Sequence, residues 1–367
     1  MKTKKSSLLK RLLDWLFSIL SVIVLLAMLA SVLCCWIDPV RWVWPAYFGL
    51  AFMMLLAVAI FLFVVMLLLK SRKIWVAILA LIVSVPGVIK SFAFNGGGDE
   101  KSSLRVLSYN LHGFVDVKDG RSPEVFADDV VAMIKDNAPD VVCFQEFHSY
   151  RAKNERVACI DELAERCGFL YKYYNRKRNY AGNVIMSKYP IEPLAPGNYF
   201  GDENRFGIMV KVDAGASGSF YVASIHLTTF LLTDEEVDFV LDKPKSSENV
   251  EKYGKSILKK LKHAFEKRSV DRKTMMDGYP DLTLPVLLCG DFNDTPLSFT
   301  YNSFSKAGFV DSFLAAGRGL GVTYAGPLPL LRIDYIWTKD GVESQYFKVV
   351  DFGGSDHYPI RLDLTLK

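Results

Sequence analysis

The sequence predicts an α/β domain of packed sheets that follows an apolar, membrane-spanning region. Hydrophobic residues make up 51% of the 367 positions, but they are concentrated before Phe94. From Gly96 onward, charged and apolar residues are mixed as in a soluble globular domain. From Leu104, strand-like and helix-like segments alternate, and the strands outnumber the helices. We therefore expect packed sheets flanked by helices.

Three apolar segments are candidate membrane spans. Residues 15–37 and 46–69 carry no charge, and each is long enough to cross a hydrocarbon core of about 30 Å. Residues 74–94 contain Pro86, Gly87 and Lys90, and they span only if Lys90 reaches the interface; the alternative is a re-entrant or interfacial helix. The sequence thus predicts a membrane region at 1–94, a glycine-rich linker at 95–103 and a domain at 104–367.

Basic residues indicate the orientation of these spans. Eight Lys and Arg precede the first span or separate the second from the third, whereas Arg41 alone lies between the first two. The positive-inside rule then places the N-terminus in the cytoplasm. Three spans predict a multi-pass protein whose domain is extracytoplasmic, which means periplasmic in a Gram-negative cell.

The charge of the domain disfavours one class of function. Ten of the 44 Lys and Arg and four of the 40 Asp and Glu lie in residues 1–100, so 34 basic and 36 acidic residues remain for the domain. A dedicated non-specific nucleic-acid binder would usually have a basic excess. The six cysteines show no metal-type CxxC spacing and are interpreted as buried thiols.

Strands and helices are expected at defined places in the domain. The expected strands are 104–110, 140–146, 183–188, 207–212, 219–226, 285–290, 333–338 and 358–365, and the expected helices are 124–137, 155–167 and 246–268. Polar residues collect at the strand ends.

Two of these strand ends carry carboxylates. Glu146 follows a buried-type strand, and a hard divalent cation prefers such an oxygen; the alternative is a solvated strand end. Asp291 and Asn293 are two positions apart, so an extended backbone points both to one face, and Gly290 permits close approach of another group. The alternative for this pair is an Asn/Asp turn.

Asp334 lies within an expected strand, where a buried carboxylate is unfavourable unless it is paired. His357 is a candidate partner. A carboxylate that accepts the imidazole N–H fixes the tautomer and raises the basicity, as a water-activating base requires. The alternative is a surface pair of Arg332 with Asp334 and an ordinary loop histidine.

Asn110 and His226 end two further strands and complete the polar set. Each signal is weak alone, because a single histidine at a strand end is more often structural than catalytic. His112, His148 and His263 are interpreted as structural, although His112 is close to Asn110 in sequence.

The order of these features resembles the endonuclease/exonuclease/phosphatase superfamily, the deoxyribonuclease I-like fold, across residues 104–367. The matching series is Asn110, Gln145–Glu146, GNVIMSKYPI at 182–191, His226, GDFN at 290–293, RIDYI at 332–336 and SDHYP at 355–359. The resemblance implies a four-layer α-β-β-α sandwich with an active site along one rim of the paired sheets. It also implies cleavage of phosphoester bonds with Mg²⁺ or Mn²⁺.

The same resemblance implies a metal site. Glu146 would be the principal ligand, with Asn110 and Asp356 contributing, and either one or two ions would bind.

It implies catalytic roles as well. Asp334 would orient His357, Asp291 and Asn293 would position the attacking water and the phosphate, and His226 would contact the phosphate or assist the leaving group. Either Asp291 or His357 would be the general base.

The segment between His226 and Asp291 departs from the family pattern. It contains a Lys-rich helical stretch, residues 252–272, which is interpreted as an inserted or elongated, solvated surface element; the alternative is a role in contacting the substrate or a headgroup.

The predicted function is hydrolysis of a phosphodiester or phosphomonoester by activated water, outside the cytoplasm. The predicted partners are the bilayer and a substrate that is a lipid headgroup, a small phosphorylated molecule or nucleic acid; no protein partner is predicted. The alternative is a membrane-anchored nuclease acting on extracellular nucleic acid. An inactive scaffold is disfavoured, because every position that the chemistry needs holds a competent residue.

Overall fold

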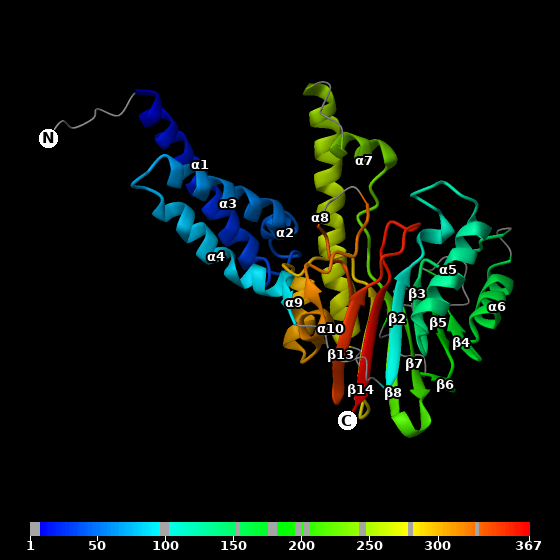
Figure 1. Cartoon of the computed structure of the whole chain (residues 1–367). Helices are drawn as coiled ribbons and strands as arrows, with labels where there is room; N and C mark the ends of the chain where they lie inside the picture. The colour runs from blue at the N-terminus through cyan, green and yellow to red at the C-terminus, as the bar shows by residue number, and fades with distance from the viewer. Residues whose placement is uncertain are drawn as a thin grey trace. The chain divides into compact units, whose positions relative to one another are not determined.

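The computed structural model describes residues 8–95, 103–151, 155–174, 182–194, 200, 206–241, 247–277, 282–326 and 330–367 (Figure 1). Most of the predicted linker, residues 96–102, lies outside these ranges. The chain divides into two compact units. The helical unit comprises Met1–Ser91 with Thr295–Ser303, and the sheet unit comprises Phe92–Asp294 with Phe304–Lys367.

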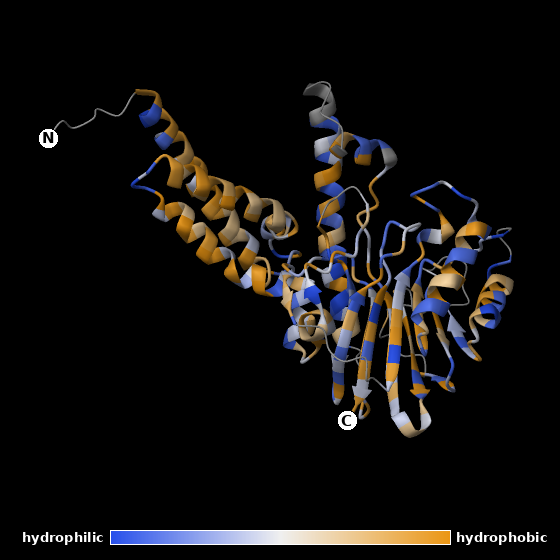
Figure 2. Cartoon of the chain, viewed as in Figure 1, coloured by the Kyte–Doolittle hydropathy of each residue, from blue (hydrophilic) through white to orange (hydrophobic). Residues whose placement is uncertain are grey.

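The helical unit is apolar along most of the length of its helices (Figure 2). Outward side chains such as Leu26, Phe61 and Ile82 are 61%, 58% and 58% exposed. A helix that is apolar all round suits a lipid environment better than water. The helices are α1 (Leu8–Leu33), α2 (Trp44–Leu50), α3 (Phe52–Leu68) and α4 (Trp75–Ser91).

A distant stretch of sequence, Thr295–Ser303, packs within this helical unit. Leu297 joins the apolar cluster that the helices form. Asn302 donates its side-chain N–H to the carbonyl of Cys35 at 2.7 Å, and its Oδ1 accepts from Lys90 Nζ at 3.1 Å. Lys90, which would have to reach the membrane interface for residues 74–94 to span, thus has a polar partner within the unit.

The prediction of three membrane-spanning helices is not confirmed. By length and composition, α1 can cross a membrane. Helices α2 and α3 are bent by 70° relative to each other, and they give a second span only if the two helices together are counted as a single broken span. Helix α4 has 17 residues and ends at Ser91, because Ala93 and Phe94 form a short strand, β1, in place of the predicted last helical turn. Hydropathy alone detected the apolar composition but not these breaks.

Two six-stranded sheets form the centre of the sheet unit. The first has the order β13-β14-β2-β3-β5-β4 and the second the order β10-β12-β9-β8-β7-β6. The strands of the first are β2 (Leu104–Asn110), β3 (Val141–Gln145), β4 (Tyr171–Tyr174), β5 (Val184–Ser187), β13 (Val342–Val349) and β14 (Ile360–Leu366). Those of the second are β6 (Ile191–Pro193), β7 (Gly207–Asp213), β8 (Ser219–His226), β9 (Val286–Asp291), β10 (Val310–Asp311) and β12 (Asp334–Lys339), while β1 (Ala93–Phe94) pairs separately with β11 (Arg318–Gly319).

The main core lies between the two sheets. Val106 and Val141 of the first sheet share one buried cluster with Val210, Leu287 and Ile336 of the second. This follows from the alternation of side chains along a strand, since every second residue faces the partner sheet.

Helices pack against the outer faces of the sheets. Phe126 and Val130 of one helix and Leu163 of another pack on the first sheet, and Phe304 stacks on Trp337 of the second with ring centroids 5.7 Å apart. The predicted α/β class is confirmed. The helices and helical turns of the described residues are α5 (Pro123–Asn137), α6 (Arg156–Cys167), α7 (Asp234–Leu241), α8 (Ser247–Asp277), α9 (Phe299–Lys306), α10 (Ser312–Ala316) and two 3-10 turns, His112–Phe114 and Gly215–Ser217.

Helix α5 shows how local sequence sets these boundaries. Ser122 caps its N-terminus by accepting the Val125 N–H, and Pro123 occupies the first turn, where a missing N–H does no harm. The helix ends at Ala138, which adopts a left-handed conformation with φ 45°. The chain then enters β3 and leads to the site.

Candidate active site

Strand pairing in the second sheet brings three predicted site residues together. Strands β8 and β9 run parallel, and their last residues, His226 and Asp291, are paired. Strand β12 runs antiparallel to β9, so its first residue, Asp334, also pairs with Asp291. One end of this sheet therefore carries two carboxylates and an imidazole.

The first sheet contributes residues to the same rim, the edge where these strands end. Parallel β2 and β3 end with Asn110 paired to Gln145, and Glu146 follows at once in a left-handed conformation, φ 50°. Such a conformation is uncommon for a residue other than glycine, and it ends the strand abruptly. Asn110 Nδ2 donates to Glu146 Oε1 at 3.2 Å and to Asp291 Oδ2 at 3.0 Å, so one amide links the polar ends of both sheets.

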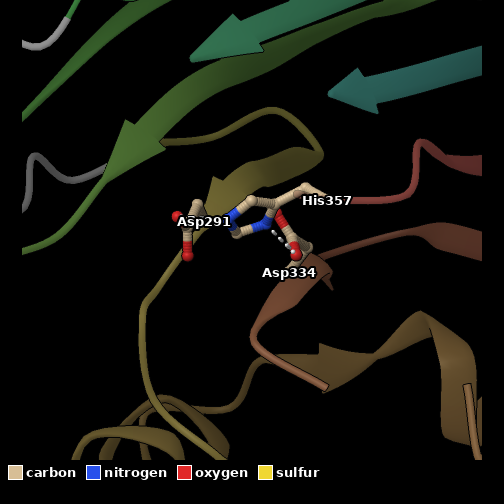
Figure 3. Close-up of side chains that lie close together, drawn as sticks. All are labelled: Asp291, Asp334 and His357. Atoms are coloured by element: carbon tan, nitrogen blue, oxygen red, sulfur yellow. Dashed lines mark hydrogen bonds and ion pairs between the residues drawn. The ribbon is translucent and has the colours of Figure 1, made fainter. Parts of the chain in front are cut away.

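His357 lies between two aspartates (Figure 3). Its Nδ1 is 2.8 Å from Asp334 Oδ2, and its Nε2 is 3.6 Å from Asp291 Oδ2. Burial alone would lower the pKa of His357, but the charges of Asp334 and Asp291 outweigh burial and raise it to about 10. Asp334 thus holds the imidazole so that the other nitrogen faces Asp291, as was predicted for an orienting carboxylate.

Asp291 is buried at the centre of the cluster. Burial raises its pKa to about 6, against the opposing charges of His357 and His226. Asn293 supports it by donating its backbone N–H to Oδ1 at 2.8 Å and its amide to Oδ2 at 3.0 Å. The two residues thus converge as the spacing predicted, although a hydrogen-bonded turn joins them, with Asn293 at φ 52°.

His226 differs from His357, because neither of its buried ring nitrogens has a hydrogen-bond partner. Nε2 lies 3.4 Å from Glu146 Oε1 and 3.6 Å from Asp291 Oδ2. The pKa of Glu146 is lowered, because the charge of His226 and the hydrogen bond from Asn110 outweigh the effect of burial. A buried imidazole without hydrogen bonds beside two carboxylates is suited to receive a ligand.

Asp356 lies at the more exposed edge of the cluster. Its Oδ1 is 3.2 Å from His112 Nδ1 and 4.0 Å from His357 Nε2. The structure thus gathers all eight predicted site residues at one rim; the roles assigned to them stay predictions.

A family model described as endonuclease/exonuclease/phosphatase matches residues 107–258 and 263–357, which is more than half of the chain and includes every residue of the rim. The chain belongs to this family. Members of the endonuclease/exonuclease/phosphatase family hydrolyse phosphoester bonds. A second model, of a domain of unknown function, matches residues 14–91.

Solved structures similar to this chain include other members of the endonuclease/exonuclease/phosphatase family. One from Beutenbergia cavernae is 21% identical, with 72% of each chain covered and a TM-score of 0.45. A mannosyl-6-phosphatase from Bacteroides thetaiotaomicron is 16% identical, with 72% of this chain and 100% of that chain covered and a TM-score of 0.47. The catalytic domain of human Nocturnin is 15% identical, with coverage of 72% and 94% and a TM-score of 0.48. No curated protein matches.

Three residues at the rim were missed or set aside at the level of sequence. His112 was interpreted as structural, yet it pairs with Asp356. Ser355 Oγ donates to the Asn110 carbonyl at 2.8 Å and accepts the His357 N–H at 3.1 Å, and Tyr324 packs edge-on against the His357 ring. The only sequence signal for His112 was its proximity to Asn110, and the only signal for Ser355 was its proximity to His357. The sequence held no signal for Tyr324.

The donor set fits a hard divalent cation. Among the described residues, Asp291, Asp334 and His357 bring ligand atoms within 4.8 Å of one another. Asn110 connects Glu146 to this group, because its amide donates to both Glu146 and Asp291. His226 adds two buried ring nitrogens that have no hydrogen bond. Carboxylate oxygens in this density suit Mg²⁺ or Mn²⁺ better than softer metals.

Proposed function

We propose that this member of the endonuclease/exonuclease/phosphatase family is a membrane-anchored, Mg²⁺- or Mn²⁺-dependent phosphoester hydrolase that acts on the extracytoplasmic side. The observation that carries the proposal is the cluster at the rim. Buried Asp291 faces two imidazoles at 3.6 Å each, and one of them, His226, has no hydrogen bond of its own. Such a cluster is unfavourable for folding alone, and it becomes favourable when a metal and a phosphate occupy it.

Glu146, Asn110 and Asp356 would hold the ion, with Asp291 close by. When bound, a divalent ion neutralises charge that develops on the phosphoryl oxygens and lowers the pKa of water. The carboxylate of Glu146 is kept ionised by its lowered pKa, as a metal ligand requires.

The remaining residues would handle the proton and the phosphate. Asp291 and His357 form one proton-accepting pair, held in place by Asp334 on one side and Asn293 on the other. His226 would donate a hydrogen bond to the phosphate or to the leaving group. No covalent enzyme intermediate is required for this attack by water.

Activity assays on the full-length protein in detergent test the reaction. Bis(p-nitrophenyl) phosphate, p-nitrophenyl phosphate, plasmid DNA, RNA, phospholipids and inositol phosphates are each incubated with Mg²⁺, Mn²⁺ or EDTA. We expect hydrolysis with either metal and none with EDTA, and Asp291→Asn serves as the matched inactive control. Cleavage that is insensitive to EDTA would exclude the metal, and cleavage of nucleic acid alone would favour the nuclease alternative.

Protease added to intact spheroplasts tests the location. If the N-terminus is cytoplasmic, an odd number of membrane crossings, such as α1 alone, puts the sheet unit on the extracytoplasmic side. Two crossings, by α1 and by the bent pair α2–α3, put the sheet unit in the cytoplasm. We expect digestion of the sheet unit in spheroplasts. Protection until lysis would show that it is cytoplasmic and would leave the catalytic assignment unaffected.

A further inference from the structure

Helix α8 was interpreted from its sequence as a solvated surface insertion, but one of its basic side chains is fully buried. Arg268 has 0% exposure, while Lys259 on the same helix is exposed. Burial lowers the pKa of Arg268, although the charges of Asp294 and Asp291 partly offset this. A cation is rarely buried without a specific function, because desolvation is unfavourable.

The contacts of Arg268 lead to two loops of the rim. Its Nη1 donates to the carbonyl of Thr228 at 3.0 Å, and its Nε lies 3.5 Å from Asp294 Oδ2. The rings of Phe230 and Phe265 lie 4.5 and 5.2 Å from the guanidinium carbon and exclude water from it.

A second contact of α8 supports the first. Asp271, one turn further along, accepts the hydroxyl hydrogen of Thr228 at 2.7 Å. Thr228 is therefore held by α8 through both its carbonyl and its side chain. The helix thus restrains the loop that leaves β8 at two points.

Thr228 and Asp294 are the outer ends of the two loops that carry the site residues. Thr228 follows His226 by two positions, and Asp294 follows Asn293 directly. The inner parts of these loops already hold each other, since the Leu227 N–H donates to the Asp291 carbonyl at 2.9 Å and Asn293 Nδ2 donates to the Leu227 carbonyl at 3.1 Å. Arg268 links the outer ends through its hydrogen bond to the Thr228 carbonyl and its ion pair with Asp294.

We propose that Arg268 is a positioning residue for the hydrolytic reaction, acting through the loops that carry His226 and Asn293. The α8 insertion is then part of the catalytic machinery and not only a surface element. His226 depends most on this support, because its ring has no hydrogen bond that would hold it in place. The kinetic part of the inference rests on the proposed function, whereas the restraint of the loops does not.

Variants of the full-length protein test the inference. Arg268→Met removes the charge and keeps the bulk, Arg268→Lys keeps the charge but not the fork of donors, and Lys259→Met is the control on the exposed face. We expect Arg268→Met to lower kcat/KM by about tenfold to a hundredfold, mainly through kcat, because small misplacement of catalytic groups affects mainly the chemical step. Arg268→Lys should recover part of the loss, and Lys259→Met should match the wild type.

A double-mutant cycle separates positioning from general stability. In a His226→Ala background, Arg268→Met should lower kcat by a clearly smaller factor than in the wild type, since one of the two groups that it positions is gone. Losses that simply multiply would overturn the proposal, as would an unchanged kcat in Arg268→Met. If Arg268→Met does not fold, Thr228→Val, which removes only the hydroxyl bond to Asp271, takes its place in the cycle.

Hydrogen exchange gives a readout that needs no substrate. We expect faster amide exchange in residues 226–229 and 291–294 of Arg268→Met, with α5 unchanged. Unchanged exchange in both loops would overturn the restraint itself. A wild-type protein that hydrolyses nothing would refute the proposed function and the kinetic role together, while exchange would still decide whether Arg268 holds the loops.

Discussion

Two histidines approach the same carboxylate oxygen from different parts of the fold. His357 Nε2 and His226 Nε2 each lie 3.6 Å from Asp291 Oδ2. His357 is fixed on its far side by Asp334 and at its backbone by Ser355, whereas neither ring nitrogen of His226 has a hydrogen-bond partner. One side of the site is thus preorganised by the protein. We call the other the open side, because we expect a ligand to supply the hydrogen bond that His226 lacks.

This difference predicts a different response to mutation on the two sides. Residues of the preorganised side should act as one unit, and their loss should be severe. A residue of the open side should contribute mainly through the ligand that it contacts, so its loss should be smaller and should appear in ligand binding as well.

The largest effect is expected on the preorganised side. His357→Ala and Asp334→Asn should each reduce kcat by about a hundredfold to a thousandfold, because Asp334 holds the imidazole that faces Asp291. The double mutant should be little worse than either single mutant. Steady-state kinetics of the three variants tests this, and simple multiplication of the two losses would show that the pair does not act as a unit.

Glu146→Gln, on the open side, should reduce activity by roughly a hundredfold, because the change keeps the shape of the side chain but removes the charge that attracts a cation. The metal concentration for half-maximal activity should rise in parallel. Titration with Mn²⁺ tests this, with Glu192→Gln, on strand β6, as the control of equal chemistry. Undiminished metal affinity would mean that Glu146 is not a metal ligand.

The rim could be predicted from sequence because its polar residues interrupt apolar strands. Asp291, Asp334 and His226 stand at strand ends, and strand pairing alone then brings them together. Arg268 could not be found in this way, because it lies in a Lys-rich stretch and its burial depends on loops from other parts of the chain.

The fold was predicted best where strands are buried on both faces. Strand β9 is buried at every position and was predicted within one residue, at 285–290 against Val286–Asp291. Strand β13, Val342–Val349, was missed because it is an edge strand with mostly half-buried residues and shows no apolar alternation. In the helical unit, composition revealed the apolar helices but could not reveal the 70° bend between α2 and α3.

A smaller effect is expected for His226→Ala. The variant should lose about tenfold to thirtyfold in kcat/KM, because it removes one contact to the ligand but leaves the Asp291–His357 pair intact. Inorganic phosphate or vanadate should raise the melting temperature of the wild type more than that of this variant. Equal stabilisation of both proteins would show that His226 does not contact the phosphate, and the contrast between the two histidines would then be structural only.

The smallest effect is on stability, and it follows from the raised pKa of His357. A group whose pKa is higher in the folded state stabilises the protein below its unfolded pKa of 6.5 and loses that contribution as the pH rises through the folded value of about 10. Asp291, with a pKa of about 6, titrates below this window. The metal-free wild type should therefore lose on the order of 1–3 kcal/mol of stability between about pH 7 and pH 10 that His357→Ala does not lose.

His226→Ala should keep the wild-type dependence of stability on pH, because it retains the Asp334–His357 pair. Urea unfolding in EDTA across this pH range measures the free energy of unfolding of the three proteins. If the stability of His226→Ala depends on pH as that of His357→Ala does, the two imidazoles do not differ as the structure implies.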